Sequence, residues 1–141
     1  MIIPDTNLLL FAINTESPDH KRAVAWWKSV VTGNEPVGLL SVVMFAFIRL
    51  STNRKVFSQP LTVDEAFAYV ENWLQFPMVS WLDSEAADFA AAKKLLKSAG
   101  TGANLVTDAQ IAAVALRLKA TVHTADFDFG RFPAVKWMNP L

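Results

Sequence analysis

Five short apolar runs separated by longer stretches with helical spacing constrain the fold of this chain more than any other feature. The runs occupy residues 1–3, 37–40, 78–81, 121–124 and 135–138. Short strands that alternate with helices of roughly 10 to 16 residues are typical of parallel sheets covered on both faces. The pattern predicts an α/β fold, a three-layer sandwich with a mainly parallel central sheet of about five strands. In such sheets, ligands bind beyond the carboxyl ends of the strands.

Capping signals place the helices between these runs. The candidates are Ser17 with Pro18, opening a helix through about Val31; Thr62 with Glu65, a capping box; Ser84, opening a helix that Gly100 ends; and the alanine-rich stretch 107–120. Linkers, repeats and low-complexity tracts are absent, so we expect one domain over residues 1–141.

Composition narrows the class of protein. Hydrophobic residues make up 52% of the chain and charged residues 18%, which favours a folded globule over disorder. Lys plus Arg and Asp plus Glu both number 13, so no net charge attracts a polyanion or a membrane. The chain has no cysteine, and its longest apolar run, "VVMFAFI", is too short to span a bilayer. With no basic segment before the first apolar run, we expect a cytoplasmic protein without a membrane partner.

Acidic residues follow two of the apolar runs. Asp5 comes directly after the first run, and Asp126 and Asp128 come after the fourth. Asp108 lies at the polar start of the helix that leads into the fourth run. Since a helix and the parallel strand after it run in opposite directions, the start of this helix should lie near the far end of that strand. If the first and fourth strands are neighbours, these carboxylates converge on one edge of the sheet.

Each of these acids also has a purely structural interpretation. Asp5 could cap the helix that begins with "LLLFAI", Asp108 could favour a helix dipole, and Asp126 and Asp128 could be turn residues. Their shared placement at strand ends favours a site. Converging carboxylates repel one another unless a cation neutralises them, and Mg²⁺ or Mn²⁺ prefers such oxygen ligands. A cation held in this way can act on a phosphodiester.

Three blocks together resemble the PIN-domain family, and in particular its VapC-type toxins. They are "MIIPDTNLLLFAI", "NLVTDAQIAAVAL" and "HTADFDFGRFPAVKWMNPL". Their order and spacing match the family over nearly the whole chain. The resemblance implies a PIN fold, Mg²⁺- or Mn²⁺-dependent cleavage of RNA, a VapB-like antitoxin as protein partner, and a homodimer.

Carried over by position, the family's functional residues fall on the four acids and on two polar neighbours. The resemblance implies Asp5, Asp108 and Asp126 as catalytic metal ligands, Asp128 as a further catalytic acid in the same loop, and Asn7 and Thr124 as polar residues that orient ligands or waters.

The chain departs from the family pattern at two positions. Many PIN domains carry another acid on the helix after the second strand, three residues before a basic residue. Counting back from Arg49 gives Ala46, which puts a second metal ion and full activity in doubt. Pro4 replaces the usual aliphatic residue, and since proline cannot donate to a ladder, the first strand should end there or meet a bulge.

The segment "VVMFAFIRLSTNRKVF" ends in basic residues, of which Arg49, Arg54 and Lys55 are candidate phosphate contacts. It could be a buried helix with a solvated end, or its apolar face could form part of a homodimer or antitoxin groove. The five tryptophans favour core packing over base stacking, and His20 and His123 lack the spacing of metal ligands.

Three hypotheses for function follow. The first is a metal-dependent endoribonuclease that acts as the toxin of a toxin-antitoxin pair. The second is a PIN module that binds RNA or a protein partner without cleavage, because Ala46 replaces an acid. The third is a phosphatase with Asp5 as nucleophile, although such enzymes usually need a second acid where Asn7 stands.

Overall fold

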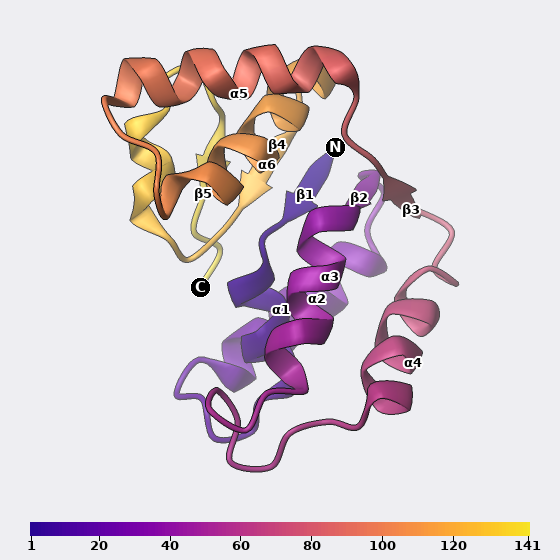
Figure 1. Cartoon of the computed structure of the whole chain (residues 1–141). Helices are drawn as coiled ribbons and strands as arrows, with labels where there is room; N and C mark the ends of the chain where they lie inside the picture. The colour runs from indigo at the N-terminus through magenta and orange to yellow at the C-terminus, as the bar shows by residue number, and fades with distance from the viewer.

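A single sheet of five strands, in the order β3-β2-β1-β4-β5, forms the centre of the computed structural model, which describes residues 1–141 (Figure 1). The strands are β1 (Ile2–Pro4), β2 (Val37–Leu40), β3 (Val79–Leu82), β4 (Thr121–His123) and β5 (Trp137–Met138). All four pairings are parallel. The predicted parallel α/β architecture is therefore confirmed, and each predicted run overlaps one of the strands.

Six α-helices and one short 3₁₀ helix surround this sheet. They are α1 (Thr6–Ile13), α2 (His20–Val31), α3 (Ser41–Ser51), α4 (Val63–Trp73), α5 (Ala86–Ala99), α6 (Leu105–Leu118) and the 3₁₀ helix η1 (Phe127–Arg131). In Figure 1, α5 runs across the top of the view above α6, and α4 lies on the opposite side of the molecule below β3. None of the helices is long and apolar enough to cross a bilayer.

Two of the predicted helix ends are confirmed. Thr62 and Glu65 form a reciprocal capping box at the start of α4, in which each side chain accepts a hydrogen bond from the other residue's backbone N–H. Gly100 ends α5 with φ of 78°, in the left-handed region that glycine adopts without the steric cost of a Cβ.

Three other predicted helix starts are wrong by one or two residues, and one of them is the start of α6, which begins at Leu105 rather than at residue 107. The Ser17 hydroxyl accepts a hydrogen bond from the backbone N–H of Asp19 and closes a turn, so α2 begins only at His20. At α5 the N-cap is Glu85 rather than Ser84, because Glu85 and Asp88 form a capping box of their own. At α2 the N-cap residue, Asp19, makes no side-chain capping hydrogen bond, whereas at α5 the Glu85–Asp88 box takes the place of Ser84.

The strand order places β1 between β2 and β4, and the chain changes direction across the sheet at this point. β1 ends at Pro4, as its missing N–H predicts. The next residue, Asp5, still donates its backbone N–H to the carbonyl oxygen of His123 at 2.8 Å. The ends of β1 and β4 are thus joined at the topological switch point, where open α/β sheets bind ligands.

The hydrophobic core is a cluster of 28 buried residues that includes side chains from β1, β2, β3 and β4. Three of the five tryptophans, Trp26, Trp27 and Trp73, are buried in it, which confirms core packing for these. The alanine-rich helix α6 is buried along its centre, from Ile111 to Ala115. Small side chains let a helix approach its neighbours closely, and this fixes the first turn of α6, with Asp108, near the sheet edge.

Candidate active site

Asp5 is both a helix cap and part of an acidic site. Its carboxylate accepts hydrogen bonds from the Thr6 backbone N–H at 2.7 Å, from the Thr124 hydroxyl at 2.7 Å and from the Asn7 amide at 2.9 Å. The residue is only 7% exposed, and burial raises its pKa above the ordinary value, while the hydrogen bonds from Thr124 and Thr6 oppose this rise. The structural and functional interpretations of Asp5 are therefore compatible.

Asn7 and Thr124 tie the loop after β1 to the loop after β4. The Asn7 amide donates to the Thr124 hydroxyl oxygen at 3.2 Å, and the backbone N–H of Ala125 donates to the Asn7 side-chain oxygen at 3.1 Å. The Thr124 hydroxyl oxygen also accepts from the backbone N–H of Asp126 at 2.9 Å. A single buried hydroxyl thus positions Asp5 and the backbone of Asp126 together.

Asp108, Asp126 and Asp128 form the tightest acidic group. Each offers one carboxylate oxygen, and these oxygens lie within 4.8 Å of one another. Asp126 caps η1 by accepting a hydrogen bond from the Asp128 backbone N–H at 2.9 Å. Asp108 reaches the group from the first turn of α6. This turn lies near the carboxyl end of β4, as predicted, because α6 and β4 run in opposite directions.

The charges of this group are not compensated by the protein. No lysine, arginine or histidine pairs with any of the four acids, since the ion pairs of the structure involve the Met1 amine, Arg22 and Arg117. Burial and then the neighbouring charges of Asp5, Asp126 and Asp128 raise the pKa of Asp108 to about 7. Such a cluster is costly unless protons or a cation neutralise it.

The donor set fits a hard divalent cation. Three carboxylates within reach of one ion, with a fourth beside them, match the all-oxygen coordination of Mg²⁺ or Mn²⁺. The tight group contains Asp128, which the resemblance implied as a further catalytic acid and not as a metal ligand, whereas Asp5, an implied ligand, is not one of its three members. The sequence could not predict whether Asp5 or Asp128 joins Asp108 and Asp126, because the position of Asp128 depends on the path of η1.

The basic candidates are not bonded to this network. Arg49, Arg54 and Lys55, at the end of α3 and in the loop that follows, are exposed and form no hydrogen bond or ion pair with the acids. Ala46 is half-buried on α3, and the acidic group includes no residue from that helix. The side chains of α3 are buried in part: Val43, Met44 and Phe47 are among those that pack in the core.

His123, the last residue of β4, links the site to the core. Its Nδ1 accepts a hydrogen bond from the indole N–H of Trp26 at 3.1 Å, and burial lowers the pKa of the imidazole. The ring is therefore neutral at pH 7. The backbone carbonyl oxygen of His123 accepts the hydrogen bond from the Asp5 backbone N–H. His123 is thus a buried structural residue, and its partner on α2 could not be found from sequence, because 97 residues separate the two.

The sequence profile of the protein family described as PIN domain matches residues 2–135 of this chain. The chain belongs to the PIN-domain family. This PIN domain is 43% identical over 141 residues to ribonuclease VapC33 of Mycobacterium tuberculosis, covering 100% of the chain and 99% of that protein. The crystal structure of FitAcB from Neisseria gonorrhoeae superposes with a TM-score of 0.68 at 25% identity, covering 99% of this chain and 98% of the other. VapBC-1 from nontypeable Haemophilus influenzae shares the fold, with a TM-score of 0.70 at 19% identity and coverage of 99% and 98%.

Proposed function

We propose that this PIN domain is a divalent-metal-dependent endoribonuclease, the toxin of a toxin-antitoxin pair. The observation that carries the proposal is the set of uncompensated carboxylates at the switch point between β1 and β4. The similarity to a protein named ribonuclease VapC33 supports RNA as the substrate. An RNA substrate and the absence of cysteine both agree with action in the cytoplasm.

In this proposal the residues have distinct roles. Asp108, Asp126 and Asp128 would hold Mg²⁺ or Mn²⁺, and the charge of Asp5 would act on the same group. A bound divalent cation supplies Lewis-acid stabilisation of charge on the scissile phosphate and a water that is easily deprotonated. Thr124 and Asn7 keep the acids oriented through the hydrogen bonds described above. The raised pKa of Asp108 implies that the metal-free site holds a proton near neutral pH, which a cation displaces.

The protein partner in this proposal is a VapB-like antitoxin. Support comes from the VapC-type relatives and from the shared fold with VapBC-1. The proposal also includes a homodimer, as the resemblance implies. Co-expression of this chain with the reading frames on either side of its gene, followed by purification through a tag on the PIN domain, tests for the antitoxin. Recovery of this chain alone would count against an antitoxin partner.

A second function is favoured by one observation, the absence of an acid at Ala46. With that carboxylate missing, the site could bind RNA without cleaving it. The three carboxylates of Asp108, Asp126 and Asp128 nevertheless suffice to bind a single cation. Enzymes that act on phosphates commonly bind Mg²⁺ through only one or two carboxylates. We therefore favour the nuclease.

The test uses total bacterial RNA and purified protein free of antitoxin. Native protein, an Asp108→Asn variant and an Asp64→Asn variant are incubated with RNA in Mg²⁺, Mn²⁺ or EDTA, and new 5′ ends are sequenced. Asp64 is the matched control because it is also an aspartate in the first turn of a helix, but it lies on α4 and is exposed. Discrete ends from the native protein and the control alone, and only with metal, support the proposal.

Failure has a defined form. If all three folded proteins leave the RNA uncut in both metals, the binding-module function replaces the nuclease. Binding of Mn²⁺ followed by calorimetry then shows whether the acids hold a cation at all.

A further inference from the structure

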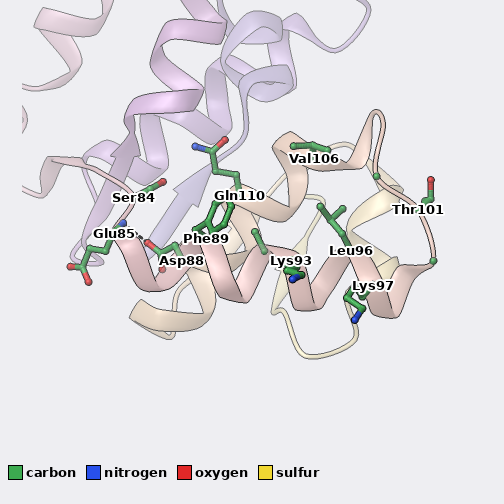
Figure 2. Close-up of a pocket in the computed structure, with 13 residues that line it drawn as sticks. Ser84, Glu85, Asp88, Phe89, Lys93, Leu96, Lys97, Thr101, Val106 and Gln110 are labelled. Carbon is green, nitrogen blue, oxygen red and sulfur yellow. Dashed lines mark hydrogen bonds between the residues drawn. The ribbon is translucent and has the colours of Figure 1, made fainter.

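A cleft of about 780 Å³ lies between α5 and α6, outside the acidic group (Figure 2). None of the four acids discussed above lines it. Figure 2 shows Phe89 and Leu96 projecting from α5 toward α6, with Val106 and Gln110 on the opposite wall. This cleft has no role in the site described so far.

Positive charge gathers along one rim of the cleft. Lys93 and Lys97 line it, Lys94 lies beside them on α5, and all three are exposed. None of the three forms an ion pair. Acids do occur at the other end of the cleft, at Glu85 and Asp88, but Arg117 pairs with both, at 3.2 and 2.9 Å. Three positive charges (Lys93, Lys97 and Arg117) against two negative charges (Glu85 and Asp88) leave a net charge of +1 around the cleft, and the two unpaired lysines lie together on one rim.

Two apolar side chains in the walls of the cleft are highly exposed to solvent. The Phe89 side chain is 82% exposed and Val106 is 50% exposed. An aromatic ring beside free lysines is the combination that binds single-stranded nucleic acid, because bases stack on the ring and phosphates contact the cations. A net charge of zero for the chain makes this local patch the more significant.

The cleft adjoins the acidic group through η1. Arg131, three residues after Asp128, donates a hydrogen bond to the carbonyl oxygen of Ala99 at the end of α5, at 3.2 Å. Across α6, Val106 and Gln110 line the cleft while Asp108, between them in sequence, faces the acids. Because residues two apart on a helix point to nearly opposite sides, the two sites are separated by the width of one helix, ~10 Å.

We propose that this cleft binds the nucleotides that flank the cleaved bond of a single-stranded RNA. Lys93 and Lys97 contact backbone phosphates, and Phe89 stacks on a base. The strand passes over the loop between α5 and α6 to reach the acids. This inference rests on the proposed nuclease function, and it identifies substrate-binding residues that differ from Arg49, Arg54 and Lys55.

Binding is measured by fluorescence anisotropy with a labelled single-stranded RNA of roughly 12 nucleotides, within the span that such clefts cover. The protein carries Asp108→Asn, so the RNA stays intact. The double change Lys93→Ala and Lys97→Ala should weaken binding roughly tenfold and reduce the slope of log affinity against log salt by about 1.4, or about 0.7 for each lost phosphate contact. Phe89→Ala should weaken binding roughly fivefold with no change in slope.

The control is a double change of Lys21→Ala and Lys28→Ala on α2. It removes the same charge, and Lys28, like Lys97, lies in the last turn of its helix. We expect the control to change affinity by less than about twofold, because neither lysine lines the cleft. Equal losses in the two double variants would overturn the proposal, since they would show a diffuse electrostatic effect.

Two further measurements separate this proposal from its alternatives. With the native acids present, the Lys93 and Lys97 variant should cleave RNA with a higher KM and an unchanged kcat; an unchanged KM would refute the cleft while leaving the nuclease intact. RNA binding through the cleft without any cleavage by native protein would refute the nuclease alone. If the variants leave RNA affinity unchanged but alter the oligomer in sedimentation, the cleft is a protein interface instead.

Discussion

Replacing Asp108 by asparagine should stabilise the metal-free protein while abolishing metal-dependent cleavage. The carboxyl of Asp108 has a pKa of 3.8 in an unfolded chain and about 7 in the folded protein. The folded state therefore binds more protons than the unfolded state between these pH values, and the free energy of unfolding decreases as pH rises from about 4 to about 7. Above pH 7 the full destabilisation is present, and below pH 4 it vanishes.

The size of the effect follows from the two pKa values. At about 1.4 kcal/mol for each pH unit, the rise corresponds to at most about 4 kcal/mol. The Asp108 side chain is only half-buried and lies in the first turn of α6, so solvent screening and the helix dipole reduce this to about 2 kcal/mol. The carboxyl accepts no hydrogen bond within the protein, so asparagine sacrifices no contact. We expect Tm to rise by roughly 5–10 °C at pH 8 and to change little at pH 4.

Thermal and urea unfolding in EDTA at several pH values provide the assay, with Asp64→Asn as control, which should stay within about 0.5 kcal/mol of the native protein throughout. Adding Mn²⁺ should reverse the order, since a ligand at 100 times its Kd stabilises the native protein by about 2.7 kcal/mol and the variant much less. A variant less stable than native at pH 8, or equally more stable at pH 4 and pH 8, would refute the argument that repulsion and burial act on Asp108.

Three further changes test the supports of the site and of α5. Thr124→Val should cost about 2 kcal/mol and reduce cleavage, because Asp5 loses a buried donor at 2.7 Å; urea unfolding and cleavage rates measure both effects. Arg117→Met should destabilise the protein at pH 7 by removing the partner of Asp88, and the loss should shrink below about pH 4 as that carboxyl protonates, so a pH-independent loss in urea unfolding would contradict the pairing. Gly100→Ala should cost about 1 kcal/mol in chemical denaturation, since φ is 78° and no atom crowds the position; an unchanged midpoint would contradict this.

The sheet and the acidic edge could be predicted because both depend on short-range patterns. Each strand is an apolar run with a clear end, and Pro4 marks the end of β1 by chemistry alone. The convergence of Asp5 and Asp126 needed one further assumption, that β1 and β4 pair, which the register of Ile3 with Val122 confirms. Parallel topology then brings the residues after the two strands together.

Other features depend on tertiary packing that no local pattern contains. The helix starts near Ser17 and Ser84 were misplaced because several capping residues lie close together, and only the backbone path decides among them. The lysines of α5 fit the dipole of that helix equally well in sequence. Their second property, that two of them line a cleft with Phe89, arises only when α6 packs alongside α5.

The geometry of the acids also bears on the missing acid at Ala46. A carboxylate at residue 46 that reached the acids would add a further charge to a group in which Asp108 already has a pKa of about 7. Without it, fewer protons must leave before a single cation can bind, so the metal site should fill at lower pH than it would with the extra acid. Ala46→Glu tests this reasoning. The change should raise the pH at which Mn²⁺ binding is half-complete at a fixed low metal concentration, as measured by calorimetry in matched buffers. A lower half-point would mean that attraction to the cation outweighs repulsion among the acids, and that the alanine weakens the site.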